Sequence, residues 1–188
     1  DVSTEELAKI FASDAKKWSD INPSWPAENI LRFTTGTDSG TFDFFNETVI
    51  QKPQKLAKLD EAKALALAVS SLQTSEDDNV LVKGVEGSPY AIGYFGFAYF
   101  KEQQANLKSV SINGIEPTFD TAENGSYLLS RPLFIYSDAN IIKSKPQVAA
   151  FINFYLTRVD DVISDVGYFP ASDAALAESK AALEAALK

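Results

Sequence analysis

Apolar residues recur along the chain with two spacings, and each spacing predicts a different element. Apolar positions three and four residues apart, on one face, predict amphipathic helices. These helices are expected at 4–12, 41–51, 55–72, 76–85, 96–103, 146–155, 160–166 and 172–187. Short apolar runs bounded by glycine, proline or polar residues predict strands. These strands are expected at 30–34, 90–95, 107–112 and 128–136.

The order of these elements predicts the fold class. Strands that alternate with helices are typical of a mixed α/β sheet. Ser3 and Glu6 have the spacing of a capping box at the first helix, and Ser75 is expected to cap the helix at 76–85. Residues 113–126 hold glycine, asparagine, proline and acidic residues and predict a loop. Pro132 cannot donate a backbone hydrogen bond, so the strand that contains it is expected at a sheet edge or at a bulge.

Composition excludes several classes of function. The chain has 17 Lys and Arg against 26 Asp and Glu, a formal charge of −9, and no His or Cys. Without those two residues it cannot form a Ser-His-Asp triad, a disulfide or a zinc site of the usual kind, so no metal site is expected. The acidic balance argues against nucleic acid and against a basic membrane-surface helix. No apolar run approaches about 18 residues, so no transmembrane helix is predicted.

The segment TTGTDSGTF, residues 34–42, carries the candidate chemistry. Gly36 and Gly40 allow a sharp turn, and the helix that follows presents unpaired N–H groups and the positive end of its dipole. Thr37, Ser39 and Thr41 add hydroxyl groups. This combination is typical of a cradle for a tetrahedral oxyanion, built from hydrogen-bond donors without a net positive charge.

Asp38 favours phosphate over sulfate as the anion. A carboxylate beside the cradle can accept a hydrogen bond from the P–OH of a hydrogenphosphate, whereas sulfate offers no proton at neutral pH. Two other readings of the turn remain open. The same residues can simply cap the helix, as in a structural or adhesive domain, or Ser39 can be a hydrolase nucleophile, which the absence of His disfavours. No Lys follows Gly40, so the turn is not a P-loop.

Several further segments carry a family resemblance. They are STEELAKIF, KKWSDINPSWP, TGTDSGTFDFF, SEDDNVLVKGV, AIGYFGFAYF, SYLLSRPLFIY, VAAFINFYL and VGYFP. In order and spacing, over nearly the whole chain, they resemble the phosphate-binding proteins of bacterial ABC phosphate importers. The resemblance implies a type II periplasmic-binding-protein fold of two hinged lobes that hold phosphate between them. It also implies an extracytoplasmic, non-enzymatic protein without a cofactor, whose partners are inorganic phosphate and ABC transporter membrane subunits.

By this resemblance, Ser39, Gly40 and Thr41 are the phosphate ligands, and Thr37 or Asp38 lies near an acidic position of the family. Sulfate or another oxyanion is the alternative ligand. Many members carry an Arg just before the turn, where this chain has Thr34 and Thr35. Strand alternation directs Arg32 away from the turn, and Arg131 is expected as an anion ligand or an ion-pair partner.

The resemblance also implies that part of the family's length is missing. Residues 1–104 correspond to the second lobe, 105–115 to a hinge crossing, and 116–188 to the C-terminal part of the first lobe. The N-terminal part of that first lobe is expected to be absent. The strand at 128–136 would then have an open edge, which leaves self-association, repacking or packing against a missing chain as alternatives.

Overall fold

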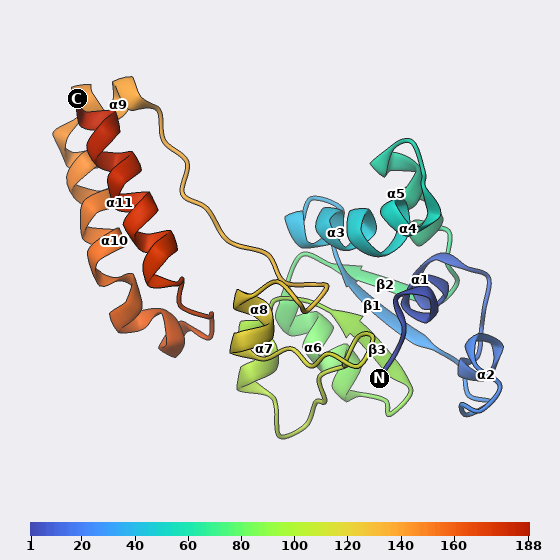
Figure 1. Ribbon diagram of the computed structural model, residues 1–188. Helices are drawn as coiled ribbons and strands as arrows, with labels where there is room; N and C mark the ends of the chain where they lie inside the picture. The colour runs from blue at the N-terminus through green and yellow to red at the C-terminus, as the bar shows by residue number, and fades with distance from the viewer. The chain divides into compact units, whose positions relative to one another are not determined.

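The computed structural model describes residues 1–188 and divides into two compact units (Figure 1). Unit 1 comprises residues 1–118 and 127–129, and unit 2 comprises residues 119–126 and 130–188. Each unit has its own cluster of buried apolar side chains. The sheet and the glycine-rich turn belong to unit 1, whereas unit 2 is helical.

Unit 1 is built on a three-stranded parallel sheet. Its strands are β1 (Leu31–Thr35), β2 (Leu72–Ser75) and β3 (Ala91–Tyr94), in the spatial order β2-β1-β3. The central position of β1 is seen in the register, where Thr34 is paired with both Thr74 and Tyr94. The predicted α/β class is confirmed, with helices between successive strands.

Alternate side chains of β1 face two helical layers, as strand geometry requires. The Phe33 ring packs against Gly84 of α6 (Asp78–Glu86), where an added Cβ would lie 2.2 Å from a ring carbon. The Arg32 guanidinium, on the opposite face, reaches the end of α1 (Thr4–Ala12). A larger residue at position 84 would therefore separate α6 from the sheet.

The larger hydrophobic core lies on the Arg32 face of the sheet. The helices that enclose it are α1, α3 (Gly40–Phe45), the π-helical η1 (Asn46–Gln51) and α5 (Leu59–Leu67), while α4 (Lys52–Gln54) continues the helical run on the surface. The Phe45 ring stacks on Tyr94 with centroids 3.8 Å apart, and Phe11 meets Phe45 edge-on at 5.0 Å. These contacts fix α3 against β3 and therefore position the turn that precedes α3.

Unit 1 also contains two short helices, α2 (Trp18–Ile21) and α7 (Phe97–Glu102). The predicted capping box of α1 is confirmed, since Ser3 Oγ accepts the Glu6 N–H at 3.0 Å and Glu6 accepts the Ser3 N–H at 2.8 Å. Trp18 and Trp25 meet edge to face with ring centroids 5.7 Å apart. Both tryptophans of the chain therefore report on unit 1.

Unit 2 is a small helical assembly. Its helices are α8 (Phe119–Glu123), α9 (Ala139–Ser144), α10 (Pro146–Val166) and α11 (Asp173–Leu187), of which the last three pack against one another. Ile142, Ile152 and Leu183 form its buried centre. Gly167 ends α10 in the left-handed conformation with φ of 93°, which glycine adopts without steric cost.

The predicted strands at 107–112 and 128–136 are wrong. Residues 131–136 are exposed and belong to no strand, and Ile112 makes only isolated bridges to Val2 and Ile115. A strand requires a neighbour for its N–H and C=O groups, and local pattern alone does not supply one.

Three helix boundaries are also corrected. The helix predicted at 55–72 is shorter and gives way to strand β2, which the pattern missed. α6 is capped by Asp77 instead of Ser75, because the Asp77 side chain accepts the Asn79 N–H at 2.9 Å. The segment 160–166 continues α10, helix α8 lies within the predicted loop at 113–126, and helix α9 lies where no element was predicted. No helix has the length and apolar character to cross a membrane.

Candidate functional site

The candidate site lies at the carboxyl edge of the sheet in unit 1. The turn Gly36–Thr41 follows β1, the acidic loop Glu76–Asp78 follows β2, and Gly96 follows β3. Because the strands are parallel, these three connections emerge at one edge, where α/β proteins bind ligands. The Gly36 N–H donates to the Ser75 carbonyl at 2.9 Å, which links the start of the turn to the end of β2, just before the acidic loop.

The turn is organised around Ser39, the N-cap of α3. Ser39 Oγ accepts the Thr41 N–H at 3.1 Å, and the Ser39 N–H donates to the Gly36 carbonyl at 3.1 Å. The helical run begins at Gly40 and continues without a break through α3, η1 and α4. No hydrogen bond within the chain uses the backbone N–H of Thr37 or Gly40. These two donors can therefore serve a ligand.

The structure brings the five predicted site residues into one turn, as their closeness in sequence requires. Thr37, Asp38 and Gly40 are exposed, while Ser39 and Thr41 are half-buried. Just before the turn, Thr35 is 4% exposed, and its Oγ1 has no hydrogen-bond partner. A buried hydroxyl without a partner is costly, which makes Thr35 Oγ1 a further donor or acceptor at the start of the site.

The acidic loop contributes a residue that sequence reasoning missed. Glu76 Oε1 accepts the Asp38 N–H at 3.4 Å, and a Cβ added at Gly36 would lie 1.8 Å from that same oxygen. The Glu76 carboxylate thus rests against the turn. The sequence assigned Glu76 to a helix start. Prediction of β2 would have revealed this contact, because loops that follow adjacent parallel strands meet.

Two neighbouring carboxylates make the acidic loop more negative. Asp77 caps α6, and Asp78 accepts a hydrogen bond from the backbone of Gly96. Burial raises the pKa of Asp78 above its ordinary value, with smaller contributions from the charges of Asp77 and Glu76. The site therefore combines backbone donors on one loop with carboxylates on the next.

Arg32 does not supply the charge that the turn lacks. It is fully buried and donates to three backbone carbonyls: Nε to Ile10, Nη1 to Ser70 at 3.1 Å and Nη2 to Ala15 at 2.6 Å. Desolvation lowers its pKa. The prediction that Arg32 points away from the turn is confirmed. Arg131 is exposed and belongs to unit 2.

Tyr94, at the end of β3, is paired with Thr34 of β1. Its hydroxyl interacts with the side chains of Thr34 and Asn46, and burial raises its pKa well above the ordinary value. Tyr94 therefore stays neutral at physiological pH and acts as a hydrogen-bonding group.

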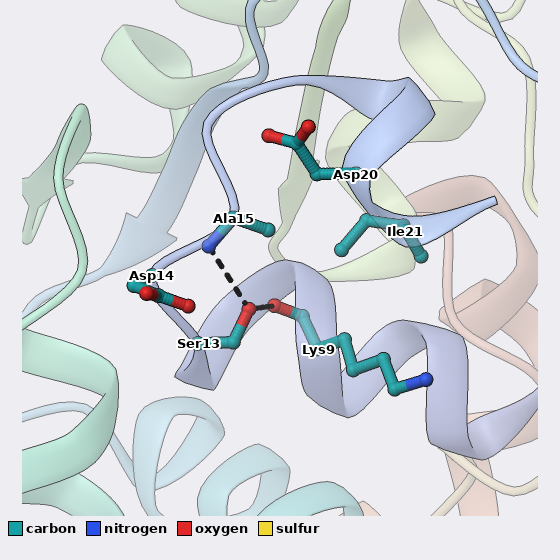
Figure 2. A pocket seen from close by; sticks show the side chains of 6 residues that line it. All are labelled: Lys9, Ser13, Asp14, Ala15, Asp20 and Ile21. Carbon is teal, nitrogen blue, oxygen red and sulfur yellow. Dashed lines mark hydrogen bonds between the residues drawn. The ribbon is translucent and has the colours of Figure 1, made fainter. Parts of the chain in front are cut away.

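A separate depression in unit 1 is unrelated to the turn (Figure 2). Its lining residues are Lys9, Ser13, Asp14, Ala15, Asp20 and Ile21. Ser13 Oγ donates to the Lys9 carbonyl at 2.6 Å and accepts the Ala15 N–H at 3.2 Å. Asp20 accepts two backbone N–H groups, which lower its pKa. These polar groups already hold the end of α1 and the loop after it, a structural role.

Comparisons of sequence place the chain among known proteins. The family model described as PBP superfamily domain matches residues 1–159. The chain is 36% identical over 183 residues to Protein SphX of Synechocystis sp., covering 93% of this chain and 51% of that protein. It is 35% identical over 173 residues to Phosphate-binding protein PstS of Staphylococcus haemolyticus, covering 89% of this chain and 50% of that protein. The chain spans about half the length of the curated relatives it matches.

Solved structures show the same partial coverage. A crystal structure described as a possible phosphate binding protein from Planctomyces limnophilus aligns with 38% identity and a TM-score of 0.76. The alignment covers 99% of this chain and 64% of that one. An ABC-type phosphate transport receptor from Vibrio cholerae aligns with 20% identity and a TM-score of 0.65, which shows likeness of fold.

Proposed function

Because this chain belongs to the PBP superfamily, we propose that it binds inorganic phosphate at the turn Gly36–Thr41, as part of the solute-binding component of an ABC phosphate transporter. The observation that carries the proposal is the turn itself, which presents unused backbone donors at the carboxyl edge of the sheet. The names of the relatives support phosphate as the anion.

The donors of the turn suit a tetrahedral oxyanion. The N–H groups of Thr37 and Gly40 and the hydroxyls of Ser39 and Thr41 lie at the start of a continuous helical run, where the dipole favours negative charge. A hydrogen bond to a charged oxygen contributes about 1.5–3 kcal/mol net, and less where water competes. The open turn of this chain alone therefore supports weak binding, and enclosure by further protein would strengthen it.

The proposed organisation follows from the share of the relatives that the chain covers. We assign residues 1–104 to one lobe, 105–115 to a hinge crossing and 116–188 to the C-terminal part of a second lobe. The division into units near residues 118–130 supports a boundary in this region. Coverage of about half the relatives' length supports a second lobe that is incomplete in this chain.

Binding without catalysis is the second part of the proposal. Ser39 Oγ serves as the acceptor of a helix cap, and the chain contains no His or Cys to activate a nucleophile. One of the relatives is named Phosphate-binding protein PstS. An extracytoplasmic location with ABC transporter membrane subunits as partners, and no nucleic acid, accords with these names and with the charge of −9.

Titration of the full chain with phosphate, followed by amide NMR shifts, tests the proposal and detects millimolar binding. We expect saturable shifts centred on Gly36–Thr41 at constant ionic strength. Ser39→Ala should abolish them and cost about 1 kcal/mol of stability through the lost cap. Ser172→Ala is the matched control, because Ser172 caps α11 in unit 2 by accepting the Ala175 N–H.

The two serine variants separate binding from capping. Ser172→Ala should lose a similar amount of helix stability and keep the phosphate response. Phosphate shifts spread over both units, or shifts that survive Ser39→Ala, would contradict the proposed site. Absence of any shift would favour the plain helix-cap reading of the turn.

A further inference from the structure

The ring of Tyr94, the last residue of β3, is fixed against the core of unit 1. It stacks on Phe45 with centroids 3.8 Å apart and planes 8° apart, and it meets Phe11 edge-on at 5.3 Å. Aromatic contacts from two directions hold a ring in one orientation. The hydroxyl at the end of this ring therefore has one defined place, where it interacts with a residue of β1 and a residue of η1.

That hydroxyl connects the two segments that flank the turn Gly36–Thr41. It interacts with the side chain of Thr34, which lies on β1 two residues before the turn, and with the side chain of Asn46, at the start of η1. Asn46 Nδ2 donates at 2.8 Å to the carbonyl of Phe42, the residue that directly follows the turn. The strand that enters the turn and the helix that leaves it are thus joined through Tyr94.

Asn46 has features that packing alone does not explain. Its side chain is 0% exposed, and its Oδ1 is buried without a hydrogen-bond partner. A buried polar atom in this state costs stability that an apolar residue would not lose. Asn46 also begins a stretch of π-helix, a rare geometry that is frequent at functional sites. A polar side chain kept at such a cost, just behind the turn, indicates a role in the site.

We propose that Tyr94 is a positioning residue of the anion site. Its hydroxyl, held between Thr34 and Asn46, fixes the end of β1 relative to the start of α3 and so keeps the turn in the form that presents its N–H donors. The inference rests on the proposed function and deepens it. Donors that are already in place need not be ordered when an anion binds, and such preorganisation raises affinity. Tyr94 acts here through the backbone and needs no contact with the anion.

Phosphate titration of the full chain, followed by the amide NMR shifts of Gly36–Thr41, tests this role. Tyr94→Phe keeps the ring that stacks on Phe45 and removes the hydroxyl alone. We expect the phosphate Kd to rise about fivefold, the effect of one neutral hydrogen bond. Without phosphate, the amides of Ser39 and Thr41, which are hydrogen-bonded within the turn, should exchange with solvent about fivefold faster, while the exchange rates of α6 stay unchanged.

Tyr127→Phe is the matched control. Tyr127 is also a half-buried tyrosine of unit 1, and its hydroxyl donates to the Val110 carbonyl at 3.1 Å instead of joining the segments that flank the turn. Its loss should lower the free energy of unfolding in urea by a similar amount and leave the phosphate Kd and the exchange of the turn amides unchanged. A general loosening of unit 1 would instead change both variants alike.

Thr34→Val removes the hydroxyl at the strand end of the same connection, with little change of shape. If Tyr94 acts through this cluster, the two changes are not independent. The double variant Thr34→Val/Tyr94→Phe should then bind phosphate as Tyr94→Phe does, because the connection is already broken. Native amide spectra of each variant show that the fold is retained.

The outcomes separate this inference from the function on which it rests. If the parent chain gives no phosphate shifts, the proposed function and this inference both fail. If the parent chain binds phosphate and Tyr94→Phe has the same Kd, only the role of Tyr94 is overturned. Equal rises of Kd in Tyr94→Phe and Tyr127→Phe, or effects of Thr34→Val and Tyr94→Phe that multiply in the double variant, would also overturn it.

Discussion

Replacement of Arg32 by Met tests whether this buried cation is structural. Arg32 lies on the central strand with 0% exposure, and its guanidinium bonds the carbonyls of Ile10, Ala15 and Ser70. The Ile10 carbonyl is among the last four of α1, which have no partner inside their own helix. Arg32 thus joins the end of α1, the loop after it and the approach to β2.

The expected cost follows from those three bonds. Met fills a similar volume but leaves three carbonyls without their donor, at about 1–3 kcal/mol each where no water replaces it. In the other direction, the Met variant avoids the desolvation cost of burying a cation that has no carboxylate partner, which is several kcal/mol. The difference is a net destabilisation of about 2–4 kcal/mol, a large fraction of the usual 5–15 kcal/mol of a folded domain.

Urea unfolding followed by tryptophan fluorescence measures this cost in unit 1, which contains both Trp18 and Trp25. Arg158→Met, followed by circular dichroism, is the control. Arg158 is exposed and pairs with Asp161 at 3.3 Å, so its loss should stay within about 0.5 kcal/mol. An Arg32→Met chain as stable as the parent would refute the capping role. A stable variant that no longer binds phosphate would identify Arg32 as an anion ligand.

Two further predictions concern pH and association. Hydrogen bonds from the Ser3 backbone and the Asn22 amide lower the pKa of Glu6 below 4.5. The folding stability that the Glu6 carboxylate contributes is therefore complete above pH 4.5 and is lost as the pH falls through the lower pKa of the folded state. In urea unfolding at pH 6, 4 and 3, the free energy of unfolding should fall less with pH in Glu6→Gln than in the parent chain. An equal fall in both chains would contradict the role given to Glu6. Phe134 and Tyr136 are 66% and 86% exposed, so the chain should self-associate through this segment. The double change to Ser should lower the mass found by sedimentation, and equal masses would exclude the segment.

Local signals were sufficient for the turn and its flanking elements. The capping box at Ser3, the strand before Gly36 and the helix after Ser39 all depend on residues within a few positions of one another. Local hydrogen bonds and apolar spacing decide such elements, so the sequence predicted them closely. The direction of Arg32 also followed from strand alternation alone.

Elements that depend on distant partners were not predicted. β2 is short, half-exposed and polar, and only its first residue, Leu72, lay in a predicted element, the helix at 55–72. Its strand character comes from pairing with β1, where Arg32 is opposite Leu72. The segment 128–136 shows the converse, because it has the apolar pattern of a strand but forms no strand in the structure. Pattern indicates the capacity to pair, and pairing itself requires a second segment.

The same distinction explains why Glu76 was missed as a site residue. Its approach to Gly36 requires β2 to lie beside β1 in a register that places Thr35 opposite Ser75. A shift of this register by one residue would turn the side chains of β2 to the other face. The candidate donors of the turn can thus be read from one short segment, whereas the contact of Glu76 with that turn depends on long-range strand pairing.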